Sequence, residues 1–103
     1  MDIKKLLGKR IQELRKSKNI TQEYMAELIG IETVSLSNIE RGKYYPASEN
    51  LSKIIDVLGV EPEELFALGH LKPHKELIEE MVKVLVHNEN MTRMVYKFFK
   101  SIS

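Results

Sequence analysis

The stretch TQEYMAELIGIETVSLSNIERG, residues 21–42, contains two short helical patterns separated by a glycine. The first pattern follows Thr21, a favourable N-cap residue, and its apolar side chains recur at helical spacing at Met25, Leu28 and Ile29. It ends at Gly30, because glycine adopts the left-handed conformation that closes a helix at little cost. The sequence therefore predicts a short helix that stops at a tight turn.

The second pattern predicts a helix over residues 32–41, with Gly42 as its terminator. A helix of about ten residues is marginally stable alone, so its apolar face, Leu36 and Ile39, is expected to pack on neighbouring helices. The opposite face carries only short side chains, which are Thr33, Val34, Ser37 and Asn38.

Short side chains on an exposed helix face allow another molecule to approach the helix backbone closely. The major groove of B-DNA is about 12 Å wide and accepts a helix presented in this way. A polar face that contacts only solvent would show the same pattern. The residues of this stretch alone therefore leave DNA binding and simple solvation as alternatives.

Helical periodicity continues on both sides of this stretch. A first helix is predicted over residues 3–18, where apolar side chains recur at spacings of three and four, namely Ile3, Leu6, Leu7, Ile11 and Leu14. After the loop KYYPAS, Ser48 is expected to cap a fourth helix with an apolar stripe of Leu51, Ile54, Ile55 and Leu58. Gly59 closes that helix, and a short fifth helix follows with Pro62 at its first position.

Gly69 and Pro73 mark the best boundary in the chain. They separate a five-helix unit, residues 1–69, from a C-terminal helical extension, residues 70–103. In the extension a helix with a broad apolar face is expected first, although VKVLV also alternates like a strand. A last helix, with Asn90 as its expected N-cap, carries the apolar residues Met91, Met94, Val95, Phe98, Phe99 and Ile102. The predicted fold class is all-α.

Composition narrows the class of protein further. The 103 residues include no cysteine, which excludes a disulfide scaffold, cysteine-ligated zinc and thiol chemistry. No apolar run approaches the roughly 18–20 residues of a membrane span, and the N-terminal residues do not form a signal peptide. A cytoplasmic protein is therefore expected.

Charge is unevenly distributed although the net charge is only +1. Residues 1–46 carry nine Lys/Arg and six Asp/Glu, a net charge of +3. Residues 47–69 carry a net charge of −4, and residues 70–103 a net charge of +2. A mildly basic first part favours contact with a polyanion, although a solvated surface with chance asymmetry would look alike.

The sequence offers little support for an enzyme. His70 and His74 are four residues apart, but Pro73 between them breaks the helix that a metal-binding pair would need. Glycine-rich phosphate loops, Ser–Lys pairs at useful spacing and paired carboxylates in an apolar setting are all absent. We therefore expect neither catalytic residues, nor a metal site, nor a cofactor.

Four motifs follow one another in a fixed order: RIxxLR, TQxxxAxxxG, SxIExGK with a later proline, and LxKIxxxLGVxxxxLF. With these motifs, residues 7–66 resemble the Cro/C1-type helix-turn-helix domain of the XRE family. The resemblance implies a five-helix, lambda-repressor-like DNA-binding domain in which the helix over 32–41 is the recognition helix.

The resemblance also assigns roles to individual positions. Base edges would be contacted by Thr33, Val34, Ser37 and Asn38. The DNA backbone would be contacted by Gln22, Ser35, Arg41, Lys43 and Tyr44. Arg15 and Glu40 match a structural pair that joins the first and third helices in family members. Two features depart from the family pattern: Glu32 stands where Ser or Thr is frequent, and the base-facing set lacks Arg, Lys and Gln. We therefore expect contacted bases that lean towards A·T.

The function implied is a sequence-specific transcription regulator, a repressor that binds operator DNA as a homodimer. The apolar residues of the last helix would form the dimer interface, because one weakly basic copy alone would bind DNA weakly. Intramolecular packing of that helix is one alternative, and an antitoxin-type protein whose tail binds another protein is a second. Membrane-surface binding is disfavoured for one short helix without lipidation.

Overall fold

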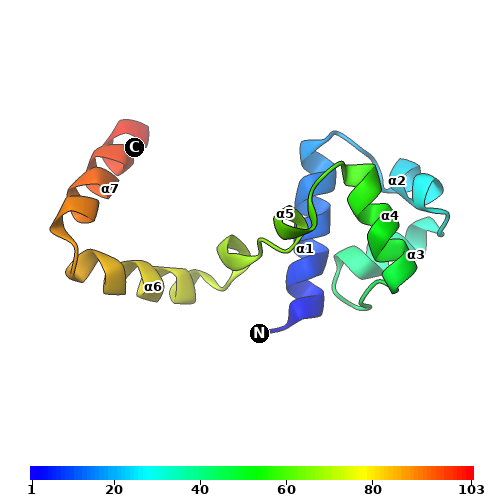
Figure 1. Ribbon diagram of the computed structural model, residues 1–103, viewed down its shortest axis with the longest axis horizontal. Coiled ribbons are helices and arrows are strands. Elements are labelled where there is room, and N and C mark those ends of the chain that lie inside the picture. Colours follow the sequence, from blue (N-terminus) through cyan, green and yellow to red (C-terminus); the bar gives the residue numbers. More distant parts are fainter. The chain divides into compact units, whose positions relative to one another are not determined.

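The computed structural model describes residues 1–103 and is entirely helical. The predicted all-α class is confirmed. The chain divides into two compact units, Met1–Leu71 and Lys72–Ser103. The helices of the first unit, shown in Figure 1, are α1 (Ile3–Ser17), α2 (Gln22–Ile29), α3 (Thr33–Glu40), α4 (Ser48–Leu58), α5 (Pro62–Leu65) and the 3-10 turn η1 (Gly69–Leu71).

One apolar core holds the first unit together. Helix α1 packs against α3, α4 and α5, and α2 packs against α3 and α4. The central side chains are fully buried and come from all five α-helices, namely Leu7, Ile11, Met25, Ile29, Leu36, Ile54, Leu58 and Leu65. The third helix is thereby clamped between α1 and α2, with one face left outside the core.

Most of the predicted helix ends in the first unit are confirmed, but the expected cap of α4 and the expected burial of Leu28 are wrong. Gly30 and Gly59 adopt the left-handed conformation and close α2 and α4. Ser48 does not cap α4, because the N-cap is Ala47 and no side chain caps that end. Leu28 is not a core residue and is 49% exposed, because the buried stripe of α2 runs through Met25, Ala26 and Ile29 and position 28 lies about 100° from its centre.

A polar cluster fastens the end of the first unit to α1. The Arg10 guanidinium donates two hydrogen bonds to the carbonyl oxygen of Glu64, at 2.9 and 3.0 Å. The Glu13 carboxylate accepts a hydrogen bond from the His70 ring at 2.8 Å and another from Arg10. These contacts keep η1 against α1, so the first unit ends at Leu71, two residues beyond the expected boundary at Gly69.

Glu13 makes one part of the stability of the fold pH-dependent. The hydrogen bonds from His70 and, secondarily, Arg10 lower the pKa of Glu13 below its ordinary value. A carboxyl group with a depressed pKa stabilises the fold above its ordinary pKa of about 4.3 and loses this contribution as the pH falls through the folded-state value. We expect His70→Ala to raise the Glu13 pKa, as followed by carboxyl ¹³C NMR titration. An unchanged Glu13 pKa in this variant would contradict the role given to His70.

The second unit is a pair of helices, α6 (His74–Val86) and α7 (Glu89–Ile102). VKVLV lies within α6, so the strand alternative is excluded. Asn90 is not the cap of α7, because Asn88 supplies the capping side chain and accepts a hydrogen bond from the Met91 N–H at 2.9 Å. None of the helices in either unit combines the length and the apolar character needed to cross a membrane.

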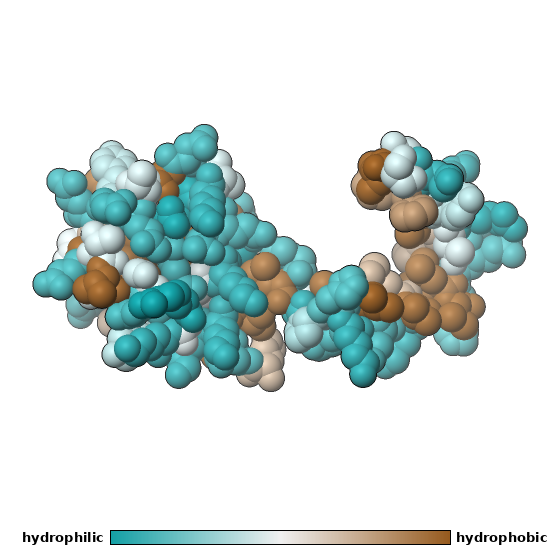
Figure 2. All heavy atoms as spheres, turned by 180° about the vertical axis from the view of Figure 1, so that it is seen from behind, coloured by the Kyte–Doolittle hydropathy of each residue, from teal (hydrophilic) through white to brown (hydrophobic).

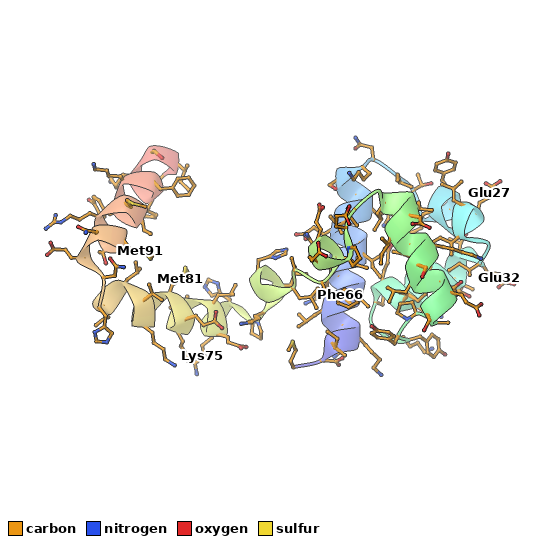
Figure 3. The ribbon with its side chains drawn as sticks, viewed as in Figure 1. Glu27, Glu32, Phe66, Lys75, Met81 and Met91 are labelled. Carbon is orange, nitrogen blue, oxygen red and sulfur yellow. The ribbon has the colours of Figure 1, made fainter.

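The second unit leaves most of its apolar side chains exposed. Neither α6 nor α7 contains a buried residue, and apolar surface follows both helices in Figure 2. Met81 and Met91 lie in the angle between the two helices (Figure 3) and line an open groove of about 280 Å³ there. All the predicted interface side chains of α7 are exposed in the single chain, namely Met91, Met94, Val95, Phe98, Phe99 and Ile102.

Candidate nucleic-acid interface

Helix α3 turns one face into the core and the other outward. Leu36 is fully buried and Ile39 is 6% exposed, as their spacing predicts. The outward face is formed by Val34, which is 57% exposed, and by three partly buried polar residues, Thr33, Ser37 and Asn38. The side chains that were expected to contact bases therefore share one accessible face.

The start of α3 has no capping side chain. Glu32 occupies the N-cap position in an extended conformation but makes no side-chain hydrogen bond to the helix, and Thr33 is already the first helical residue. The helix thus begins one residue later than predicted. Glu32 is exposed beside the turn that follows α2 (Figure 3), so its charge stands at the edge of the outward face.

Gly8 sets how closely α1 and α3 approach each other. A Cβ atom built on this buried residue would lie 2.4 Å from the carbonyl oxygen of Ile39 and 2.6 Å from that of Glu40. Both carbonyls belong to the last turn of α3, so only glycine permits this contact. The depth at which α3 sits in the first unit therefore depends on the absence of a side chain at position 8.

A buried ion pair fixes the far end of α3. The Glu40 carboxylate accepts hydrogen bonds from Arg15 Nε at 2.7 Å and Arg15 Nη2 at 3.0 Å, and its side chain is 1% exposed. The hydrogen bond to Glu40 raises the pKa of Arg15 above its ordinary value. Arg15 also donates to the carbonyl oxygen of Ile20 at 2.7 Å. The two residues paired by the family resemblance thus lie in contact in the structure.

Gln22 joins this network instead of standing free. Its side-chain amide donates a hydrogen bond of 2.9 Å to the Glu40 carboxylate. Helices α1, α2 and α3 are therefore tied together at one carboxylate, and no buried side-chain polar atom in the structure lacks a hydrogen-bond partner. Gln22 was expected to contact the DNA backbone and also to be able to brace the third helix, and the hydrogen bond to Glu40 is such a brace.

The loop after α3 is held against the start of α1. Gly42 adopts a φ of +76°. Its N–H donates a hydrogen bond to the carbonyl oxygen of Ile39, and the Lys43 N–H donates one to the carbonyl oxygen of Asn38. A Cβ atom at Gly42 would come within 2.6 Å of the Lys5 Cα atom. Both the left-handed conformation and the close approach to α1 therefore require glycine here.

This loop presents a cationic and aromatic edge. Arg41, Lys43 and Tyr44 are exposed, and the Lys43 ammonium lies 5.5 Å from the centre of the Tyr44 ring. Ser35 is partly buried on α3. The predicted backbone-contacting residues on α3 and in the following loop thus lie next to the outward face, where they can donate hydrogen bonds to an anionic partner.

One contact in this region was not predicted from the sequence. The Arg41 guanidinium donates a hydrogen bond to the side-chain oxygen of Asn38, three residues earlier. The spacing could have suggested it, because residues three apart are neighbours on a helix.

The structure contains no group of three or more His, Asp or Glu residues that could hold a metal ion.

Comparison with known proteins agrees with this geometry. The helix-turn-helix family profile matches residues 11–65 of the chain. The chain is 31% identical over 96 residues to the cryptic phage CTXphi transcriptional repressor RstR of Vibrio cholerae, an alignment that covers 93% of this chain and 86% of RstR. It is 28% identical over 105 residues to the HTH-type transcriptional regulator PuuR of Escherichia coli, but spans only 57% of the length of PuuR.

A solved structure shows the same fold. The restriction-modification controller protein C.AhdI from Aeromonas hydrophila superposes with a TM-score of 0.60 and 33% sequence identity, covering 64% of this chain and all of that protein. The names of these relatives are those of regulators and controllers. They agree with the expectation of a DNA-binding regulator and not an enzyme.

Proposed function

Because the chain belongs to the helix-turn-helix (XRE) family of DNA-binding transcription regulators, we propose that it represses transcription by occupying specific operator DNA as a homodimer. The main support for this proposal is the outward face of α3, which is accessible and carries only short side chains. The helix itself is held in place by the close contact at Gly8, by the Arg15–Glu40 ion pair and by the hydrogen bond from Gln22. RstR, named as a repressor, supports the choice of repression.

Helix α3 would read the major groove. Its outward side chains offer a methyl group at Val34, a hydroxyl at Ser37, both at Thr33, and an amide at Asn38. Amides pair with adenine and methyl groups contact the thymine methyl, whereas guanine is read chiefly by Arg and Lys. The contacted base pairs are therefore proposed to lean towards A·T.

The loop after α3 would supply the sequence-independent part of the affinity. Arg41 and Lys43 place two cations beside the recognition face, with Tyr44 and Ser35 as further hydrogen-bond donors. Each phosphate neutralised steepens the slope of log K against log salt by about 0.9. Gln22, engaged with Glu40, would act on binding mainly through the position of α3.

Asn38→Ala and Lys43→Ala test the two kinds of contact. On duplexes selected from random DNA by the wild-type chain, Asn38→Ala is expected to remove about 1–3 kcal/mol of discrimination at one base pair. Lys43→Ala is expected to weaken binding to all duplexes alike and to reduce the salt slope by about 1.

The measurement is competition binding at several salt concentrations. Glu27→Ala is a matched control, since Glu27 is exposed on α2 (Figure 3) and has no proposed DNA contact. Selected half-sites rich in contacted G·C pairs, or an Asn38→Ala variant with unchanged base preference, would count against the proposed reading face.

The second unit is proposed to supply the dimer. Its two helices bury no residue between them, and contiguous exposed apolar surface of this kind marks interaction sites. Helix α6 carries more acidic than basic side chains whereas α7 carries more basic ones, so α6 of one copy and α7 of another are complementary in charge. Two-fold symmetry would also match two half-sites about one helical turn apart.

Light scattering of the full chain and of residues 1–71 tests the dimer. The full chain is expected at twice the monomer mass and the shortened chain at the monomer mass, because the entire core lies within Met1–Leu71. Loss of the second unit should also weaken operator binding. Monomeric masses for both chains would overturn the dimer.

A further inference from the structure

The hydrogen bond between Arg41 and Asn38 has a defined direction. A guanidinium group has donors only, so the Asn38 side chain must contribute its oxygen and not its NH₂ group. The partner lies three residues further along the chain, at the end of α3. Arg41 therefore selects one of the two orientations of the Asn38 carboxamide, which differ by a half-turn about its last bond.

Orientation decides what Asn38 can read. Adenine offers an N7 acceptor and an N6–H donor side by side in the major groove, and a carboxamide pairs with both only when its NH₂ and oxygen face the correct atoms. An amide oxygen has two lone pairs, so it can accept from Arg41 and from adenine together. A half-turn of the amide would instead set donor against donor.

We propose that Arg41 is a specificity-determining residue that acts by holding the Asn38 carboxamide ready for adenine. This inference rests on the proposed function and deepens it. The role differs from a phosphate contact, which fixes register but carries no sequence information. Arg41 has five N–H donors, so the bond to Asn38 leaves others for the DNA backbone.

Two substitutions separate the roles. Arg41→Met removes both the charge and the donor, whereas Arg41→Gln removes the charge but keeps an NH₂ group able to donate to Asn38. Lys43→Met is the matched control, because it removes a neighbouring exposed cation whose side chain does not bond the Asn38 carboxamide, and it keeps the backbone hydrogen bond from Lys43 to the Asn38 carbonyl. Full-length chains would be compared on the selected operator and on its single-base-pair variants, at the base pair where Asn38→Ala loses its preference.

The wild-type chain should prefer A·T at that base pair on the order of tenfold. Arg41→Met should reduce this preference to about twofold or less, Arg41→Gln should retain most of it, and Lys43→Met should leave it unchanged. In the Asn38→Ala background, Arg41→Met should change the preference no further, because the two residues act as one unit.

The opposite pattern would overturn the inference. If Arg41→Met and Lys43→Met weaken all duplexes alike with the preference intact, Arg41 contacts only the DNA backbone. An Asn38→Ala variant without any change in base preference would overturn it as well. A wild-type chain that binds all duplexes equally would instead refute the proposed function itself, so the two failures are distinguishable.

Discussion

Replacing Glu40 by alanine is expected to lower the free energy of unfolding by about 3–5 kcal/mol. The substitution leaves the Arg15 charge buried with only the Ile20 carbonyl as partner, and it also removes the acceptor for Gln22. Domains of this size are stable by about 5–15 kcal/mol, so much of the stability would be lost. Urea unfolding followed by circular dichroism measures the change.

Matched variants identify the cause. Glu27→Ala removes an exposed carboxylate from α2 and should change the free energy of unfolding by no more than about 0.5 kcal/mol. Adding Arg15→Met to Glu40→Ala should restore part of the loss, because the unpaired charge is then removed. A Glu40→Ala protein within about 1 kcal/mol of wild type would show that the ion pair does not hold α3 in place.

Gly8→Ala is expected to destabilise the first unit by about 1–3 kcal/mol, even though alanine is the better helix former by about 1 kcal/mol. The new methyl group would lie 2.4 Å from a backbone oxygen of α3, and backbone cannot swing aside as a side chain can. Helices α1 and α3 would have to separate. Operator affinity should fall with stability, because α3 is the proposed reading helix.

Gly69→Ala is the matched control for this effect. No atom lies within 4 Å of the position that its Cβ would occupy, so its stability should stay within about 0.5 kcal/mol of wild type. The comparison again uses urea unfolding. A Gly8→Ala protein as stable as Gly69→Ala would mean that the contact between α1 and α3 relaxes without cost.

Much of the fold could be predicted because each helix is marked by local chemistry. The spacing of apolar residues, the glycines that end helices and Pro62 at the start of a helix all depend only on residues within one or two helical turns, so they can be recognised in the sequence. Leu28 shows the limit of such patterns, because periodicity does not reveal where the centre of a buried stripe lies when a small residue such as Ala26 belongs to it. The predictions of Ser48 and Asn90 as N-caps were wrong in a similar way, because a residue one or two positions earlier occupies the cap.

The candidate site needed more than local patterns. Arg15 and Glu40 are 25 residues apart, and only the family resemblance brought them together before the structure did. Gly8 left a signal, since an isolated glycine within a helical pattern often marks a close contact, but its partner on α3 could not be read from spacing. The apolar face of α7 could be predicted from the sequence. Its partner could not, because the same pattern suits an interface with a second copy of the chain and an interface with a different protein equally well.

Intermolecular NOEs between the isotopically labelled full chain and a selected operator duplex would show directly whether α3 lies in the major groove. This placement of α3 predicts NOEs from the methyl groups of Thr33 and Val34 to base protons in the major groove. A specific complex in which α3 shows no NOE to any base, while another element contacts the groove, would contradict it.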